Sequence, residues 1–280
     1  MASAAKQPAV LDTGALVFAA DMYGLQLDQL AELRGGVTVR QARALVTRWE
    51  RAGLAESARL GPGPAWVWLT ASGLRACGVR YAAGPPALAR LAHIRAATAV
   101  RLALEAASGF REASAYWRSE RRLRARLGGR LGSRDHLPDG EVHWPDGTAV
   151  NWAGECWAIE VELTAKTVAR TTGIMRELLA RTGDYGCAAA DARVPGLPPR
   201  HTRVIYLCSP AATGTVLRAR DALGSLGARI EVRGLPPGAD MPAAPATRAP
   251  ARTPLAPTAP AGTAPAGTAP AGTGPAGTGP

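Results

Sequence analysis

The apolar run from Cys156 to Leu163 is the strongest strand signal in the chain, and Glu160 and Glu162 interrupt it. Side chains alternate along a strand, so one face of this run should be apolar and the other should carry both glutamates. Two carboxylates on one face of a buried strand are costly unless they are paired, bound to a metal ion or open to water. The run therefore predicts a sheet with a polar site on one face.

Further acidic and basic residues extend this polar site. Asp139 lies at the start of an earlier candidate strand, and with Glu160 it would hold a divalent ion; Mg²⁺ fits best, because hard cations prefer oxygen ligands. Such an ion would polarise a phosphate oxygen and lower the pKa of a bound water. Lys166 would orient that water, Glu162 would act as a second metal ligand or general base, and Glu120 would reach the site from the preceding helix. This set predicts a centre that cleaves phosphodiesters.

Lys166 stands out because the chain is strongly biased towards arginine. Only Lys6 and Lys166 are lysines among the 33 basic residues. The alternative interpretation is purely structural: Glu160 and Glu162 would form a polar strand face paired with arginines, and Lys166 would be an exposed residue at the start of a helix. The sequence leaves both interpretations open.

The histidines form no metal-binding triad in the sequence. His136 and His143 lie close to Asp139 and are candidates for a supporting role. His93 falls near the apolar stripe of a helix, with no metal-type residue at i+3 or i+4, which favours a core or interface position. The phosphate-binding pattern Gly-x-x-x-x-Gly-Lys is absent, so we predict no nucleotide hydrolysis.

The net charge of +11 is concentrated upstream of the acidic residues. Residues 85–134 hold 11 basic and 3 acidic residues, whereas residues 135–235 hold 11 basic and 12 acidic residues. A basic segment that leads to an acidic site suits a polyanion drawn towards a metal ion. The alternative is that the arginines only solvate helix surfaces.

Residues 1–84 have the pattern of a winged-helix domain. Two short helices precede a third, from Val39 to Ala52, which Thr38 and Gln41 open with a capping box and Gly53 closes. Two strands around a Gly-Pro turn and a short helix follow. The third helix of this domain type enters the major groove of DNA, although some winged helices contact only proteins. The residues expected to contact double-stranded DNA are Arg40, Arg43, Thr47 and Arg51.

The rest of the chain alternates between helices and strands. We predict a linking helix in residues 85–109 and then, in residues 110–235, strands and helices that indicate a mixed α/β sheet. This part includes a candidate strand at Phe110–Trp117 and a hairpin strand at Thr148–Trp152. Residues 236–280 are rich in Pro, Ala, Gly and Thr, with a five-residue repeat, and are predicted to be a disordered tail.

The cysteines and the apolar segments bear on the cellular compartment. None of Cys77, Cys156, Cys187 and Cys208 forms a Cys-x-x-Cys pair, which favours reduced, buried thiols. We find no signal-peptide pattern and no apolar run of membrane-spanning length. These features predict a cytoplasmic protein without a membrane partner.

The acidic residues resemble the PD-(D/E)xK restriction-endonuclease-like superfamily. That superfamily has an αβββαβ core, with an Asp on the second strand and (Asp/Glu)-x-Lys on the third. Pro138-Asp139 corresponds to the first part of the motif and Glu160 to the acid of the second, whereas Glu162 stands at the lysine position. Some members carry Glu-x-Glu at these positions, and in others the lysine of the motif lies elsewhere in the sequence. By this resemblance Lys166 would take the place of that lysine. The resemblance implies an α/β nuclease-like domain after the α+β winged helix.

Residues 12–235 also resemble the replication-relaxation family of plasmids and conjugative elements. The segments that carry this resemblance are Trp66-Val67-Trp68-Leu69-Thr70, Gly73-Leu74, Leu91-Ala92-His93, Trp117-Arg118-Ser119-Glu120, Pro138-Asp139-Gly140, Ala158–Thr164 and Val204–Leu207. The resemblance implies a role in the replication or DNA relaxation of a mobile element, with partner proteins of a replication or mobilisation complex.

Three functional hypotheses follow. In the first, a winged helix finds DNA and a nuclease-like domain nicks or cleaves it with Mg²⁺. In the second, the chain is a DNA-binding accessory protein or transcriptional regulator with an inactive nuclease-like core. In the third, it is an adaptor that recruits other proteins. Binding of a divalent metal ion at Asp139 and Glu160 distinguishes the first hypothesis from the second. Salt-dependent DNA affinity distinguishes both of them from the third.

Overall fold

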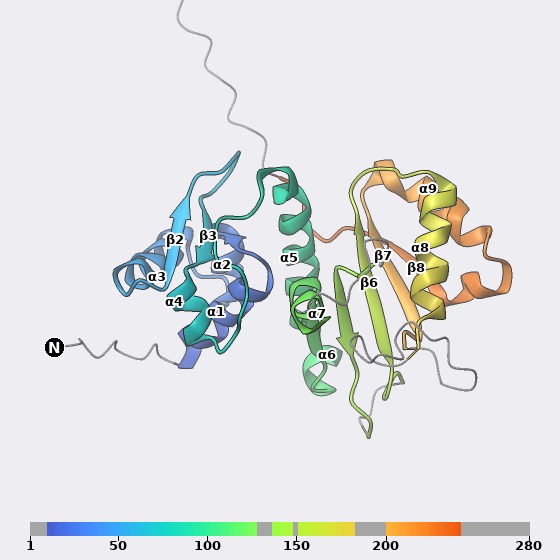
Figure 1. The fold of residues 1–280 in the computed structure, drawn as a ribbon, viewed down its shortest axis with the longest axis horizontal. Coiled ribbons are helices and arrows are strands. Elements are labelled where there is room, and N and C mark those ends of the chain that lie inside the picture. Colours follow the sequence, from blue (N-terminus) through green and yellow to red (C-terminus); the bar gives the residue numbers. More distant parts are fainter. Residues whose placement is uncertain (1–9, 128–135, 148–150, 183–199, 242–280) are drawn as a thin grey trace, which may run out of the picture. The chain divides into compact units, whose positions relative to one another are not determined.

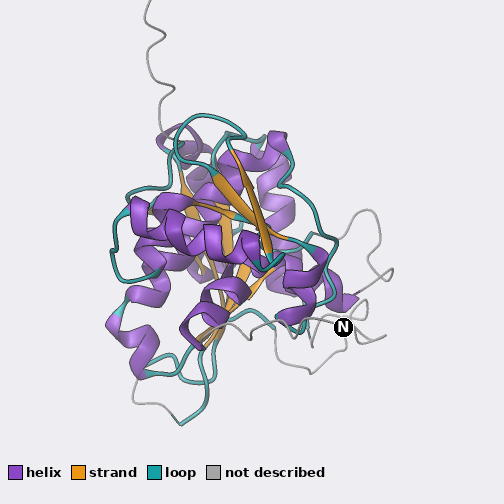
Figure 2. Cartoon of the chain, turned by 90° about the vertical axis from the view of Figure 1, so that its left-hand side faces the viewer, coloured by secondary structure: helices purple, strands orange, loops and turns teal. Residues whose placement is uncertain are grey.

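The computed structural model describes residues 10–127, 136–147, 151–182 and 200–241. They form a mixed α/β structure with one sheet of three strands and one of five (Figure 1). Helices lie on several sides of the strands (Figure 2). The predicted α/β class is confirmed at this level.

The three-stranded sheet is antiparallel, in the order β1-β3-β2. Its strands are β1 (Leu25–Gln26), β2 (Ala55–Ala58) and β3 (Trp66–Leu69). The helices around it are α1 (Val10–Asp21), α2 (Leu27–Leu33), α3 (Val39–Arg51) and α4 (Ala71–Ala76). The predicted succession of three helices, a hairpin and a short helix is present, with β1 as an additional short strand.

Helix α3 begins and ends where the sequence predicts. Thr38 Oγ1 accepts a hydrogen bond from the Gln41 backbone nitrogen at 3.2 Å, and the Thr38 nitrogen donates to Gln41 Oε1 at 2.9 Å. Gly53, with φ of 69°, follows the C-terminal cap in the left-handed conformation that glycine adopts without strain. The predicted apolar stripe is buried at Ala42, Leu45, Val46 and Trp49, but Val39 is exposed.

A 3₁₀ turn, η1 (Leu88–Arg90), leads into α5 (Leu91–Ala106). Leu88 and Ala92 are apolar residues at the start of this linking helix, and both are exposed. Leu88 belongs to η1, whose different winding turns its side chain away from the face that α5 buries. The buried face of α5 instead includes Ile94 and Val100.

Arg95 on α5 is buried and connects distant parts of the chain. Its Nη2 lies 2.7 Å from Asp28 Oδ2 on α2, and its Nε donates to the Asp240 carbonyl at 2.8 Å. Ala239 is also buried. The predicted tail starts at Pro236, yet residues 236–241 pack on the folded part of the chain; the tail from 242 onward lies outside the described residues.

The five-stranded sheet has the order β4-β5-β6-β7-β8. The pairs β4–β5 and β5–β6 are antiparallel, and the pairs β6–β7 and β7–β8 are parallel. The strands are β4 (Tyr116–Ser119), β5 (Gly140–His143), β6 (Cys156–Glu162), β7 (Arg203–Cys208) and β8 (Ile230–Gly234). The associated helices are α6 (Ser108–Glu112), α7 (Glu120–Leu127), α8 (Val168–Ala180), α9 (Pro210–Asp221) and the 3₁₀ helix η4 (Gly224–Arg229).

Both faces of β6 are covered. Trp157, Ile159 and Val161 belong to the apolar core that includes α5, whereas Ala158 on the other face packs with α8 and α9. Figure 1 shows the sheet between these two sets of helices. The predicted alternation along β6 is present, but Glu160 and Glu162 are buried as well, at 4% exposure each.

Two predicted strands differ in the structure. The segment predicted as a strand at Phe110–Trp117 begins in α6, and β4 starts only at Tyr116, because Phe110 packs into the core from a helical turn. Of the predicted hairpin strand, Asn151 and Trp152 lie in a turn, and residues 148–150 lie outside the described residues. The other predicted strands and helices of this region are confirmed to within a few residues.

Candidate functional site

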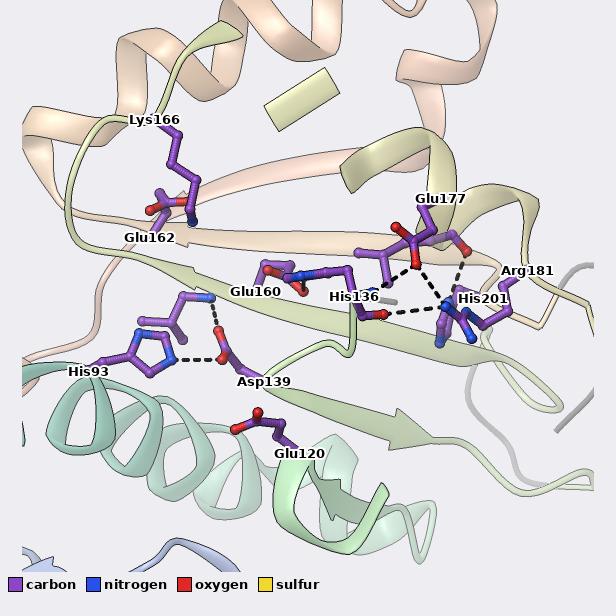
Figure 3. A network of polar contacts seen from close by, with 12 residues as sticks. His93, Glu120, His136, Asp139, Glu160, Glu162, Lys166, Glu177, Arg181 and His201 are labelled. Carbon is purple, nitrogen blue, oxygen red and sulfur yellow. Dashed lines mark hydrogen bonds and ion pairs between the residues drawn. The ribbon is translucent and has the colours of Figure 1, made fainter. Parts of the chain in front are cut away.

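Three acidic residues occupy neighbouring positions across the five-stranded sheet. The Glu120 nitrogen donates to the Asp139 carbonyl at 3.1 Å, which continues the pairing of β4 with β5. Gly140 pairs with Ile159, so Asp139, one residue earlier, stands opposite Glu160 on β6. The sheet register therefore brings Glu120, Asp139 and Glu160 into one row (Figure 3).

The Asp139 carboxylate is held by two groups. Its Oδ1 lies 2.7 Å from His93 Nε2 on α5, and its Oδ2 accepts a hydrogen bond from the Val161 backbone nitrogen at 2.8 Å. Burial raises the pKa of Asp139, but the His93 charge and these hydrogen bonds outweigh it, so the pKa lies below its ordinary value. Asp139 is thus an anion fixed in place between α5 and β6.

Glu160 is held by His136, whose Nε2 lies 2.8 Å from Glu160 Oε1. The backbone nitrogen of His136 donates to Glu177 Oε1 on α8 at 2.9 Å, and Arg181 donates to the same oxygen at 2.9 Å. Burial, with a further contribution from the charge of Asp139, raises the pKa of Glu160 above its ordinary value, although His136 acts in the opposite direction. Glu160 is therefore a buried acid that lacks full charge compensation.

The two histidines take up protons more readily than free histidine does. Burial disfavours the charged ring of His93, but Asp139 outweighs this and raises the His93 pKa. Glu160 raises the pKa of His136 in the same way. Each histidine therefore forms a charge-assisted pair with one acid of the site.

Glu162 and Lys166 pair with each other. Lys166 lies in the loop after β6, and its Nζ donates to Oε2 of Glu162, the last residue of β6. Glu162 is buried, whereas a third of the Lys166 side chain is exposed, at 33%. The predicted role of Lys166 at the Asp139–Glu160 pair stays a prediction, because the ammonium group turns towards Glu162.

Glu120 faces arginines as well as Asp139. Its Oε2 accepts from Arg90 Nη2 at 2.8 Å and its Oε1 from Arg124 Nη2 at 2.6 Å. A cavity of about 20 Å³ between α5, α7 and the start of β5 is lined by Glu120, Asp139, His93 and Arg90, among others. This volume holds about one water molecule beside Glu120 and Asp139.

Tyr206 contributes an unused donor to the same region. It pairs in register with Glu160, and its ring is almost fully buried. Within the described residues its hydroxyl has no hydrogen-bond partner. Burial and the charges of Glu160 and Glu162 raise the pKa of Tyr206 well above its ordinary value, so the phenol keeps its proton. A buried phenol without an acceptor beside two carboxylates suits a bound water.

A divalent ion at Asp139 and Glu160 fits this arrangement. Burial is the main cause of the raised pKa of Glu160, and the charge of Asp139 adds to it, so a cation between the two carboxylates would stabilise the ionised form of Glu160. Both residues offer the carboxylate oxygens that Mg²⁺ prefers. His93 and His136 hydrogen-bond one oxygen of each acid, so an incoming ion competes with these two rings.

A second polar cluster lies around Glu141, which is fully buried on β5. Arg200 contacts both carboxylate oxygens at 2.6 Å, and His201 Nε2 and His143 Nε2 each lie 2.9 Å from one of them. These contacts outweigh burial and hold the Glu141 pKa far below its ordinary value. His143, predicted to support Asp139, belongs to this cluster instead.

The ligand atoms of Glu141, Cys156 and His201 lie within 4.8 Å of one another, which is a spacing that a metal ion can use. Two arginines already neutralise Glu141, however: Arg200, and Arg118 at 3.6 Å. A cation placed there would face both guanidinium groups at short range. We therefore interpret the cluster as a charge centre that ties β5 to β4 and to the residues before β7.

The residues predicted to contact DNA lie on the outer face of α3. Arg40 and Arg51 are exposed, and the described part of the chain offers neither of them an ion-pair or hydrogen-bond partner. Arg43 contacts Ser57 Oγ on β2 at 2.5 Å, and the Thr47 hydroxyl donates to the Arg43 carbonyl at 3.1 Å. Arg40 and Arg51 are thus available to an external anion, whereas Arg43 also fixes α3 to the hairpin.

The comparisons with known proteins leave identity open. No family model, curated protein or solved structure matches this chain. The resemblances to the replication-relaxation family and to the PD-(D/E)xK superfamily therefore stay predictions. Within the described residues, no helix has the length and apolar character needed to cross a membrane.

Sequence reasoning missed several residues of the site. His93 was predicted at a core or interface position, yet its ring contacts Asp139; Glu141, Arg200 and His201 were not singled out. One signal was present, since Glu141 and His143 are i and i+2 on a predicted strand and so share a face. The partners from α5 and from the residues before β7 had no comparable signal.

Proposed function

We propose that this chain binds double-stranded DNA and cleaves it with a divalent ion held by Asp139 and Glu160. The observation that carries the proposal is the row of Glu120, Asp139 and Glu160 across β4, β5 and β6, in which the anion Asp139 stands opposite the buried Glu160. The replication or relaxation of a mobile element would be its setting, as the family resemblance implies.

The first part of the chain supports DNA binding. The order α1-β1-α2-α3-β2-β3 and the three-stranded antiparallel sheet fit a winged helix, in which α3 would enter the major groove. Arg40 and Arg51 are exposed on α3 and would contact DNA phosphates or base edges. Arg59 is exposed where the hairpin turn starts and would extend the same contact surface.

The second part supports a restriction-endonuclease-like domain. Three antiparallel strands, β4, β5 and β6, are followed by α8 and by β7, which pairs parallel to β6. This order fits the αβββαβ core of the PD-(D/E)xK superfamily with α5 as its first helix and α6 and α7 as additional helices. Glu160 lies on the third strand, as the acid of that motif would, and Asp139 lies one residue before the second strand, on which the superfamily carries its Asp.

Within this proposal each side chain has a separate task. Asp139 and Glu160 would hold the ion, which supplies a polarised phosphate and a more acidic water. His93 and His136 position the two carboxylates and accept or release protons as the ion binds. Lys166 would turn from Glu162 towards the phosphate, and Tyr206 would donate to a water beside Glu160.

The test is cleavage of supercoiled plasmid with Mg²⁺ or Mn²⁺ by the wild type and by the isosteric variants Asp139→Asn and Glu160→Gln. Glu231→Gln is the matched control, because Glu231 pairs only with its neighbour Arg233 on β8. We expect nicked or linear plasmid from the wild type and the control, and intact plasmid from both site variants. Equal cleavage by all four proteins would assign the activity to another site or to a contaminant.

A second candidate function rests on the histidine contacts. Because His93 and His136 already hydrogen-bond both acids, the pair is partly stabilised without a metal ion. This arrangement favours a DNA-binding accessory protein whose nuclease-like domain is inactive. Plasmid that stays intact with either metal, while the wild type and both site variants shift duplex DNA in a gel, would favour this function.

A further inference from the structure

An open pocket of about 430 Å³ lies between α7, the start of α5 and the segment of residues 80–87. Its volume is in the range of small-ligand sites. Its lining combines four arginines and two tyrosines with small apolar residues, which separates it from the acidic row next to it. The residues that define this arginine pocket are Tyr23, Arg80, Tyr81, Arg90, Arg121 and Arg124.

Arg121 builds the wall of the pocket. Its guanidinium group lies between two rings, 4.6 Å from the centre of Tyr23 and 4.7 Å from that of Tyr81. Arg121 also donates to the carbonyls of Ala20 and Ala82. Burial lowers the pKa of Arg121, and its donors are largely used by the protein. It therefore fixes the two tyrosines and leaves ligand binding to the other arginines.

Tyr23 adopts a backbone conformation that is uncommon for a bulky residue, with φ of 63°. That conformation places its ring against Arg121 and 5.2 Å from the guanidinium carbon of Arg90. Strained residues of this kind cluster at ligand sites, where the surrounding structure holds a side chain in a required position. The strain at Tyr23 is thus a second feature of this pocket that points to a ligand.

Four of the residues that line the pocket are arginines and none is acidic. Glu120, beside the pocket, pairs with both Arg90 and Arg124, whose side chains are 41% and 54% exposed. Arg80 is exposed, and we find no ion-pair partner for it in the described ranges. The pocket therefore holds three accessible arginines, which makes it a site for an anion.

The arginine pocket adjoins the acids of the proposed cleavage site. The small cavity at Asp139 and Glu120 shares Tyr23, Arg90 and Arg121 with it. Arg90 therefore borders both spaces, with Glu120 between Arg90 and Asp139. An anion held by Arg80, Arg90 and Arg124 would lie next to the small cavity that Glu120 and Asp139 line.

We infer that the arginine pocket binds a backbone phosphate of the DNA strand that reaches Asp139. This inference rests on the proposed function and extends it, because it assigns the strand a second anchoring point besides α3. A phosphate offers the charge and the acceptor oxygens that several guanidinium groups recognise together. In this arrangement Glu120 is a counter-ion that the phosphate displaces from Arg90 and Arg124. The negative charge of Glu120 therefore lowers the affinity of the pocket for phosphate.

The test measures binding of a short fluorescein-labelled duplex by anisotropy over a series of KCl concentrations, with EDTA present so that no cleavage interferes. The pocket variants are Arg80→Ala, Arg124→Ala and their double variant, and Glu120→Gln removes the counter-ion. Arg40→Ala with Arg51→Ala tests α3. Arg233→Ala is the matched control, an exposed arginine on β8 that pairs only with Glu231.

For the double pocket variant we expect the slope of log affinity against log salt to become shallower by about 0.9, the effect of one lost phosphate contact. Glu120→Gln should bind the duplex roughly threefold more tightly, because one nearby negative charge is removed. Arg233→Ala should bind like the wild type. Arg80→Glu provides a further check, since this exposed position tolerates the change and should weaken binding more than Arg80→Ala.

The outcomes separate the inference from the proposed function. If the α3 variants weaken binding while the pocket variants and Glu120→Gln match the wild type, the pocket inference is wrong and DNA binding through α3 stands. If only the pocket variants weaken binding, the pocket is supported and the α3 assignment is wrong. A wild type that does not bind the duplex at low salt would overturn both.

Discussion

His93 on α5 and Asp139 ahead of β5 contact each other at 2.7 Å between Nε2 and Oδ1, across 46 residues of sequence. Glu160 makes the equivalent contact with His136. Each acid of the proposed metal site therefore has a histidine that shares its proton, and a metal ion must compete with that proton.

The first prediction concerns the pH dependence of metal binding. The pKa values of His93, His136 and Glu160 are all raised, so these groups keep protons to a higher pH than usual, and an incoming cation displaces those protons. The affinity for Mn²⁺ should therefore increase as the pH rises from about 6 to about 8. Calorimetric titration in two buffers of different ionisation enthalpy would measure both the affinity and the protons released. An affinity that does not change with pH, without proton release, would contradict this site.

The second prediction concerns the pair of Glu162 and Lys166. Lys166→Met leaves the buried Glu162 carboxylate without its cation and should lower the free energy of unfolding by about 1–3 kcal/mol. The double variant Glu162→Gln with Lys166→Met removes both charges and should be more stable than Lys166→Met alone. Urea unfolding at neutral pH gives the values. Simple addition of the two single effects would show that the pair contributes no coupling.

The third prediction concerns Glu141. Glu141→Gln removes the buried carboxylate charge that Arg200, His143 and His201 contact, and it should cost about 3–5 kcal/mol of stability at neutral pH. Glu231→Gln breaks an exposed pair and should cost at most about 1 kcal/mol. Urea unfolding compares both variants with the wild type, and EDTA should leave all three unchanged if the cluster holds no metal ion.

The pH dependence of the Glu141 variant follows from the sign of its shift. A depressed pKa in the folded state adds stability above the ordinary pKa of 4.5, and this contribution is lost as the pH falls towards the folded-state value. The stability difference between wild type and Glu141→Gln should therefore narrow progressively below about pH 4.5. A difference that stays constant down to the acid transition would show that the charge of Glu141 is not what stabilises the cluster.

The fourth prediction concerns Gly140, the residue after Asp139. A Cβ atom there would lie 2.0 Å from Trp117 Cζ2, so Gly140→Ala forces the buried indole to move. We expect a loss of about 1–3 kcal/mol, together with weaker metal binding because Asp139 shifts with the strand. Gly173→Ala on α8 is the control: its Cβ meets open space, and it should stabilise the protein by about 0.5–1 kcal/mol. Thermal unfolding and Mn²⁺ titration of both variants would test this, and an unchanged Gly140→Ala would contradict the packing described here.

Much of the fold could be predicted because its signals are local. The capping box of Thr38 and Gln41 begins α3, and the alternating run of β6 lies where the sequence placed it. The segment at Phe110 was predicted as a strand and is helical, because its aromatic residue packs into the core from α6. Apolar runs that short do not distinguish a strand from a helix.

The candidate site could be predicted only in its acids. Asp139 and Glu160 stand out in the sequence because they interrupt or precede apolar strands. His93 lies 46 residues from its partner Asp139 and carries no pattern that links it to that acid. His136 is a candidate for support because it lies close to Asp139 in sequence, but its ring contacts Glu160, 24 residues away. Arg90, which contacts Glu120, likewise carries no signal in the sequence, because that contact depends on how α5 and α7 pack.

The sequence by itself determined the position of most helices and strands, the acidic character of β6 and the excess of arginine upstream of it. Those features depend on neighbours within a few residues, where periodicity and capping act. The tertiary structure alone decided which acid meets which histidine or arginine, and that an arginine pocket adjoins Asp139. Such contacts depend on sheet register and helix packing, which bring together residues that local patterns do not connect.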